Sequence, residues 1–424
     1  MMFLQFFVWG AWYVTVGIFM GENGMSHISH WAYTVGPLAA VISPFFLGMI
    51  ADRYFDVEKV LGVMHLLGGV AILAAPFYSS SPVTFVVLLA IHMLCYMPTI
   101  GLTNTLAFHN ITDQEKQFPL IRVFGTLGWI AAGVLVSLGL HAETTAIPFY
   151  VAGGASILMG VFSFSLPNTP PPAANKGSIT AREILGLDAL KKLSSPSFFV
   201  FILSSFLICI PLAAYYNFAP IFANDVALAN VAFKMSFGQM SEVLFMVAMP
   251  FFFRRLGVKW MLVVGMGAWV LRYALFALAA PSGVVWMIMG GIILHGICYD
   301  FFFVTGQIYV DKKSTPEIRG QAQGLLVLIT LGLGMLIGAQ VSGWLNNFYK
   351  AGADVLSASA WQSFWWVPAI FAGAIMLWIV IIIGIGLSLL IGLWLRGRRM
   401  RLVILLGRLR IHIRVMLLMN LLSR

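Results

Sequence analysis

The chain has 424 residues, of which 60% are hydrophobic and only 9% are charged, a composition that argues against a soluble fold and favours a bundle of membrane helices. The net charge of +10 does not indicate nucleic-acid binding. Eight of the 25 lysines and arginines are arginines from Arg396 onward, and the charge without them is +2. Cys95, Cys209 and Cys298 all fall in apolar stretches, so we expect neither disulfides nor a metal site.

Twelve apolar segments are long enough to cross a bilayer, six on each side of a polar linker. They lie at about 1–20, 31–51, 60–78, 83–106, 119–140, 145–166, 197–222, 232–253, 260–279, 284–309, 320–345 and 361–394. We therefore predict an all-α integral membrane protein. Its predicted parts are a six-helix half at 1–166, a cytoplasmic linker at 167–196, a second six-helix half at 197–394 and a basic tail at 395–424.

The linker begins Pro-Asn-Thr-Pro-Pro-Pro and is the only long polar stretch. Within it, Thr180-Ala-Arg-Glu183 is typical of a capping box, in which each end residue bonds the backbone of the other. The pattern predicts a short amphipathic helix over residues 184–192 that lies along the membrane surface. A disordered tether is the alternative interpretation.

Positive charges indicate the orientation of the chain in the membrane. The linker and the loops that follow even-numbered spans hold thirteen lysines and arginines, whereas the alternate loops hold only Lys234 and Lys350. Lysine and arginine favour the cytoplasmic side. We therefore predict a multi-pass protein of the cell inner membrane with the linker and both termini in the cytoplasm.

The two halves contain matching elements at matching positions. Asp113 and Pro119-Leu-Ile-Arg122 lead into span 5, and Asp311 and Pro316-Glu-Ile-Arg319 lead into span 11 at offsets of 198 and 197 residues. Parallel six-helix halves are the architecture of the major facilitator superfamily, which binds its solute between the halves. The element from Gly48 to Arg53 also resembles the signature of that superfamily in the loop between spans 2 and 3.

Glu242 and Asp300 are the only acidic residues that lie well inside a predicted span. A charge at that depth costs at least about 2.5 kcal/mol, so each carboxylate is expected to face a cavity or a partner. Gln239 lies three residues before Glu242 and shares its helical face. We interpret this face of span 8 as part of the path of a transported solute, with a structural ion pair as the alternative.

Two other spans carry polar and aromatic residues at helical spacing. Arg122, Thr126 and Trp129 share a face of span 5, and His295 and Tyr299 lie one turn apart on span 10. We interpret these faces as lining the same cavity. Arg122 could instead anchor a helix end by reaching to the surface, and His295 could be a hydrogen-bonded packing residue.

Gln5, Trp9 and Trp12 form a stripe on span 1 that could face the cavity too. Tryptophan is also common at lipid-facing and packing positions, so that alternative stays open for both rings. Arg272 lies inside span 9 without a polar stripe beside it. We interpret it as structural, either paired or reaching to the membrane surface.

The chemistry of these residues suits a neutral polar solute that has a flat ring. Aromatic side chains would stack on the ring, while the amide and carboxylate would read its hydrogen-bonding edges. A carboxyl out of water takes up a proton more readily, and each proton that moves inward gains about 2.3 kcal/mol per 100 mV. We expect no cofactor and no ATP site, since no Walker loop is present. The eight histidines are scattered, which argues against a membrane enzyme.

Eight stretches are similar to the bacterial nucleoside:proton symporters, the nucleoside permease family of the major facilitator superfamily. They are Phe3–Trp12, Tyr96–Asn104, Phe118–Thr126, Gly186–Asp188, Gln239–Phe245, Trp269–Phe276, Cys298–Phe302 and Ala322–Gly324. The resemblance runs to about residue 375. It implies a proton-coupled transporter, expected to be a monomer, with solute contacts at Arg122, Thr126, Gln239 and Glu242 and a functional carboxylate at Asp300.

Three candidate solute contacts depart from the pattern of that family. Trp129 and Tyr299 stand where phenylalanines are expected, and His295 stands where a tyrosine is expected. The glutamine and asparagine of the family on span 7 also have no clear counterpart in Pro211–Asn217. A nucleoside is the predicted solute, and a sugar, a glycoside or a nucleobase is the alternative.

Both ends of the chain depart from the family as well. The resemblance stops at about Ile381, and basic and apolar residues alternate with a period of two over Arg408–Arg414, so a helix would spread the basic residues around its surface. One interpretation is a basic membrane-surface segment attracted to anionic lipid, and the other, which we prefer, is an out-of-frame translation. We expect no cleaved signal peptide, and the start at Met1 suggests that a short cytoplasmic segment is missing.

Overall fold

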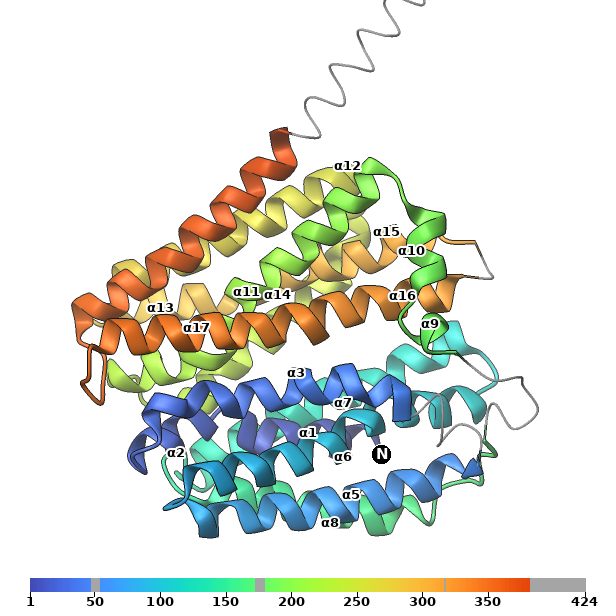
Figure 1. The fold of residues 1–424 in the computed structure, drawn as a ribbon, viewed down its shortest axis with the longest axis horizontal. Helices are drawn as coiled ribbons and strands as arrows, with labels where there is room; N and C mark the ends of the chain where they lie inside the picture. The colour runs from blue at the N-terminus through green and yellow to red at the C-terminus, as the bar shows by residue number, and fades with distance from the viewer. Residues whose placement is uncertain (47–53, 172–179, 316–317, 382–424) are drawn as a thin grey trace, which may run out of the picture. The chain divides into compact units, whose positions relative to one another are not determined.

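The computed structural model describes residues 1–46, 54–171, 180–315 and 318–381, which are almost entirely helical (Figure 1). The chain divides into two compact units, Met1–Ile375 and Met376–Arg424. The described part of the second unit, 376–381, is the end of the helix Ala358–Ile381. The predicted signature from Gly48 to Arg53, the start of the Pro316–Arg319 element and the tail beyond Ile381 lie outside the described residues.

The first half of the chain is a group of packed helices. It contains α1 (Met2–Tyr13), α2 (Val16–Glu22), η1 (Ser26–Ile28), α3 (Ser29–Phe46), α5 (Val57–Ala74), η3 (Ala75–Tyr78), α6 (Pro82–His109), α7 (Gln114–Val134), η4 (Leu135–Gly139) and α8 (Ile147–Ser163). α5 packs against both α6 and α8, and α1 packs against α7 and α8. These contacts bury a core that contains Trp12, Phe85 and Phe149, none of which is exposed.

The second half forms a similar group. It contains α11 (Pro196–Asp225), α12 (Val231–Ala279), α13 (Val285–Ile293), α14 (His295–Tyr299), η5 (Asp300–Val304), α15 (Thr305–Lys313), α16 (Arg319–Val327), η6 (Leu328–Gly334), α17 (Met335–Lys350) and the helix Ala358–Ile381. α12 covers two predicted spans, because its 49 residues run through Gly257, whose φ of 65° and ψ of 175° are not helical. η5 and η6 are π-helical turns inside longer helices.

Nine helices of the described residues are long and apolar enough to cross a membrane. α8, with 17 residues, is a shorter apolar helix, and α12 is long enough to contain two spans. The predicted all-α membrane fold is therefore confirmed. The count of twelve spans and the domain boundaries stay predictions.

The two halves meet through close helix pairs, α7 with α12 and α3 with α17. Gly133 of α7 permits the first approach, since a Cβ there would lie 2.7 Å from the Ser236 hydroxyl of α12. Gly343 permits the second, since its Cβ would lie 2.2 Å from the His30 ring of α3. A hydrogen bond of 2.8 Å from Gln340 to Thr34 also joins α17 to α3. The halves are therefore packed tightly along both pairs.

We call one end of the bundle the outer end, namely the end with the connections 23–28, 140–146, 226–230 and 351–357. Asn347 Nδ2 crosses between the halves here and donates to the His27 carbonyl at 2.8 Å. A cavity of about 240 Å³ also lies between the halves here, lined among others by Glu22, Asp225 and Lys350. In Figure 1, α2 and the connection after α17 lie at this end and α9 and α10 at the other.

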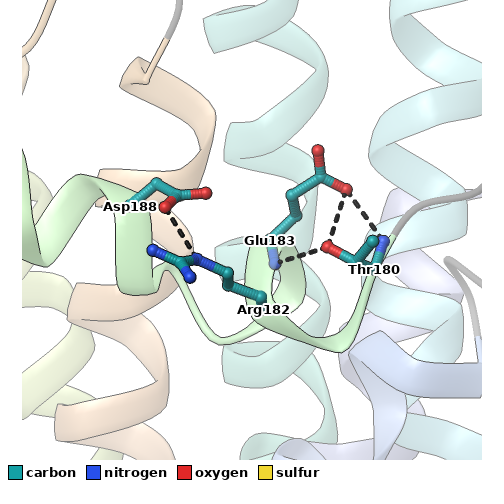
Figure 2. Close-up of polar contacts among 4 residues, drawn as sticks. All are labelled: Thr180, Arg182, Glu183 and Asp188. Atoms are coloured by element: carbon teal, nitrogen blue, oxygen red, sulfur yellow. Dashed lines mark hydrogen bonds and ion pairs between the residues drawn. The ribbon is translucent and has the colours of Figure 1, made fainter.

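The linker forms two short helices, α9 (Ala181–Ile184) and α10 (Leu187–Leu193). The predicted capping box is confirmed, since Thr180 N donates to Glu183 Oε2 at 2.8 Å and Glu183 N donates to Thr180 Oγ1 at 3.3 Å (Figure 2). The prediction of one continuous helix over 184–192 is wrong. Gly186 breaks it with a φ of 65°, and Arg182 of α9 pairs with Asp188 of α10 at 2.8 Å.

The break in the linker follows from its packing on α16. A Cβ at position 186 would lie 2.8 Å from the carbonyl oxygen of Gln321. The chain therefore approaches α16 more closely here than a residue with a side chain at position 186 would allow. Ala189 and Leu193 are buried on α10. A disordered tether is therefore wrong for residues 180–193, in which α10 packs on α16 and α9 contacts both α16 and α3.

Candidate functional site

Glu242 and His295 come together from two helices of the second half. His295 Nε2 of α14 lies 3.9 Å from Glu242 Oε2 of α12 and 3.3 Å from the hydroxyl of Tyr216 on α11. The Glu242 side chain is 23% exposed, whereas that of His295 is 1% exposed. The carboxylate is therefore accessible to water while the histidine is held inside the protein. Tyr216 completes this group and was not among the predicted site residues.

An aromatic stack holds the other face of His295. The Tyr215 ring lies 5.3 Å from the His295 ring with an interplanar angle of 20°. The Arg272 guanidinium lies 3.8 Å from the Tyr215 centroid, and its Nε donates to the Gly291 carbonyl at 2.9 Å. Arg272 is fully buried, so the interpretation that it reaches to the surface is wrong. Aromatic faces, rather than any carboxylate in the described part of the chain, surround this cation.

Arg122 of α7 lies on the first half and faces the second. Its guanidinium lies 4.1 Å from the Phe6 ring centroid and within electrostatic range of Glu242 and Tyr299. The Arg122 side chain is nevertheless exposed. Its counterpart in the second half, Arg319, instead pairs with Asp311 at 3.0 Å. The two matching arginines therefore have different environments.

Aromatic rings of both halves gather beside these charges. The ring centroid of Trp129, on the same face of α7 as Arg122, lies 5.5 Å from that of Trp9 and 6.2 Å from that of Tyr13. The ring centroid of Tyr13 in turn lies 6.4 Å from that of Tyr216 in the second half. Trp9 therefore packs on other rings of the protein rather than on lipid alone. Thr126 is half-buried between Arg122 and Trp129 on α7.

Several polar atoms near Glu242 lack partners among the described residues. The side-chain oxygen of Gln239, Nδ1 of His295 and both carboxylate oxygens of Asp300 are buried without a hydrogen bond. Asp300 is fully buried and opens the π-helical turn η5. π-turns inside helices are frequent at functional sites, and buried polar groups without partners are rare. The ring centroid of Tyr299, the residue before Asp300, lies 5.7 Å from that of His295.

Gln5 belongs to a separate network inside the first half. Its Nε2 donates to Thr99 at 2.7 Å, and its Oε1 lies 2.8 Å from His65 Nε2. His65 Nδ1 lies 3.1 Å from the Ser156 hydroxyl, so the network joins α1 to α5, α6 and α8. Gln5 is fully buried here, which makes it a packing residue rather than a cavity residue. The positions of Gln5 and His65 within apolar spans were the signals in the sequence that could have indicated this network.

Comparison with known proteins identifies the class of the chain. The profile of a family described as nucleoside H+ symporter matches residues 1–385. The chain is 39% identical over 386 residues to the transporter YegT of Escherichia coli, covering 88% of the chain and 90% of that protein. It is 32% identical over 391 residues to the nucleoside permease NupG of the same organism, covering 88% and 90%.

The structure is also similar to a crystal structure of a variant of the nucleoside transporter NupG. The TM-score is 0.79 at 28% sequence identity, and the match covers 89% of this chain and 97% of that chain. The predicted major facilitator fold is thereby confirmed. These relatives are permeases, so the prediction of a multi-pass transporter rather than an enzyme is confirmed as well.

Proposed function

Since the chain belongs to the nucleoside H+ symporter family, we propose that it carries nucleosides together with protons across the inner membrane by alternating access of its two halves. The observation that carries the proposal is the placement of Arg122 and Glu242. They extend from different halves, interact electrostatically and lie beside aromatic rings of both halves. A solute bound there would contact both halves at once, which alternating access requires.

Solute recognition is divided between the two halves in this proposal. Arg122, Thr126 and Trp129 of α7 would contact the solute from one side. Gln239 and Glu242 of α12, with His295 and Tyr299 of α14, would contact it from the other. Trp129 and Tyr299 would stack on a flat ring, and the unpartnered oxygen of Gln239 would accept a hydrogen bond from its polar edge.

Proton coupling is assigned to Glu242 and Asp300. Glu242 is reachable by water and shares its surroundings with the solute contacts, so its charge can respond to solute. Asp300 is buried and interacts electrostatically with Glu242. A charge on both carboxyls at once is unfavourable in such a setting. Protonation of one carboxyl would therefore change the proton affinity of the other.

Uptake into proteoliposomes tests this function. With an inward proton gradient we expect uridine or adenosine to accumulate, and we expect a protonophore to abolish the accumulation. Competition by nucleosides but not by sugars or free nucleobases would support the proposed solute. Competition by sugars or nucleobases alone would favour the alternative solute on the same fold. Uptake that ignores the gradient would overturn the coupling.

The remaining features of the proposal concern its setting. We place both termini and the linker in the cytoplasm, because positive charges gather in the connections at that end. The transporter would then work as a monomer in the bilayer, with no nucleic-acid partner. The outer end of the bundle would face away from the cytoplasm.

A further inference from the structure

The first turn of α12 is capped by a residue of the other half. Val231 N and Ala232 N donate to the two carboxylate oxygens of Glu143, at 3.0 and 2.6 Å. Glu143 lies in the connection between η4 and α8, at the outer end. The first amides of a helix have no partner within the helix, and a carboxylate there also interacts with the helix dipole.

A helix is usually capped by the side chain of the residue directly before it, but α12 is not. Asn230 precedes α12 with a φ of 55° and makes no side-chain hydrogen bond to it. Asparagine is among the best capping residues when its backbone is extended, but the left-handed backbone prevents that arrangement. The cap of α12 therefore depends on Glu143, and so on contact between the halves.

This contact links two of the three helices that hold the proposed solute contacts, α7 and α12. Glu143 follows α7, the helix of Arg122, and Ala232 lies on α12, ten residues before Glu242. At 1.5 Å per residue the cap is about 15 Å from the carboxylate along a single helix. Between them, Ser236 is 1% exposed and packs on Gly133 of α7. α7 and α12 are therefore in close contact at Ser236, about one helical turn from the cap toward Glu242.

We propose that Glu143 is a positioning residue for transport, which holds the first turn of α12 against the first half while the outer end is closed. When this end opens, the carboxylate must release both amides, and Ser236 then becomes accessible to water. The inference rests on the proposed alternating access. It does not depend on which solute is carried.

Cysteine labelling tests the inference in purified full-length protein. Cys95, Cys209 and Cys298 are replaced, Ser236→Cys is introduced as the reporter, and its reaction with a polar maleimide is timed. Hydrogen bonds to a charged group contribute about 1.5–3 kcal/mol, so we expect Glu143→Ala to raise the rate roughly tenfold or more. We expect a smaller rise for Glu143→Gln, because its amide keeps one acceptor oxygen. Thr144→Ala, an exposed neighbour, is the matched control and should leave the rate unchanged.

A second reporter cysteine distinguishes opening of the outer end from a loss of packing throughout the protein. Cys209 is fully buried in α11, and a protein that keeps it as its only cysteine should stay unreactive with Glu143→Ala. An unchanged Ser236→Cys rate in both Glu143 variants would overturn the inference, as would an equal rise at Cys209. The labelling needs no solute, so a failure of nucleoside uptake would refute the proposed function without deciding this question.

Discussion

Replacement of Arg272 tests how a fully buried cation is stabilised in this fold. The guanidinium lies 3.8 Å from the Tyr215 centroid and 5.2 Å from the Trp269 centroid. Two desolvated cation–π contacts contribute about 2 kcal/mol each, and the hydrogen bond to Gly291 contributes about 1.5–3 kcal/mol. Removing the charge from water costs several kcal/mol. The two sides nearly cancel, so the charge itself contributes little net stability.

We therefore expect Arg272→Met to change the free energy of unfolding by less than about 2 kcal/mol, since methionine fills the space without a charge. Arg272→Lys should lower the free energy of unfolding more than Arg272→Met, because its ammonium cannot stack flat on Tyr215 and leaves a desolvated charge without an acceptor. Arg272→Ala should cost about 3–5 kcal/mol by leaving a cavity.

Thermal unfolding of the three variants in detergent, followed by tryptophan fluorescence, measures the order. The structure predicts that methionine is tolerated best. If lysine preserved stability and methionine lost it, the charge would be essential. An acidic partner such as Asp300 would then have to approach Arg272, and the account of the aromatic stack would be refuted.

Three further predictions concern separate parts of the molecule. Glu242→Gln keeps the shape of the side chain but cannot take a proton, so we expect vesicle uptake to lose its accumulation above the outside concentration; undiminished accumulation would contradict the role of Glu242. Gln5→Leu leaves His65 Nε2 without its partner and removes the donor to Thr99, so it should cost about 1–3 kcal/mol in thermal unfolding, whereas an unchanged midpoint would argue against the network. Thr180→Ala removes one cap of α9 and should cost about 1 kcal/mol of local stability, seen as faster amide exchange in 181–184; unchanged exchange would show that packing on other helices, rather than the cap, holds α9.

Local rules explain what the sequence could predict. A charge inside an apolar span is costly wherever the helix packs, which singles out Glu242 and Asp300 without any knowledge of their neighbours. The capping box at Thr180 involves residues three apart and is equally local. The family resemblance added a nucleoside as the predicted solute and Arg122, Thr126, Gln239 and Glu242 as its predicted contacts.

Contacts between distant segments explain what the sequence could not predict. The position of Tyr216 between His295 and Tyr13 depends on three helices, and the stack over Arg272 depends on the ring of Tyr215 from α11. The break at Gly186 reflects the approach of α10 to α16 rather than its own propensity. Glu143 lies in a connection with no motif, and only the neighbouring half reveals that it caps α12.

Nucleoside accumulation in proteoliposomes under an imposed proton gradient tests the central claim most directly. The account predicts that uridine or adenosine rises above its outside concentration and falls back to equality when a protonophore is added. One proton moving down 100 mV supplies about 2.3 kcal/mol, enough for accumulation of roughly fiftyfold. Uptake that only equilibrates, with or without the protonophore, would contradict proton-coupled transport.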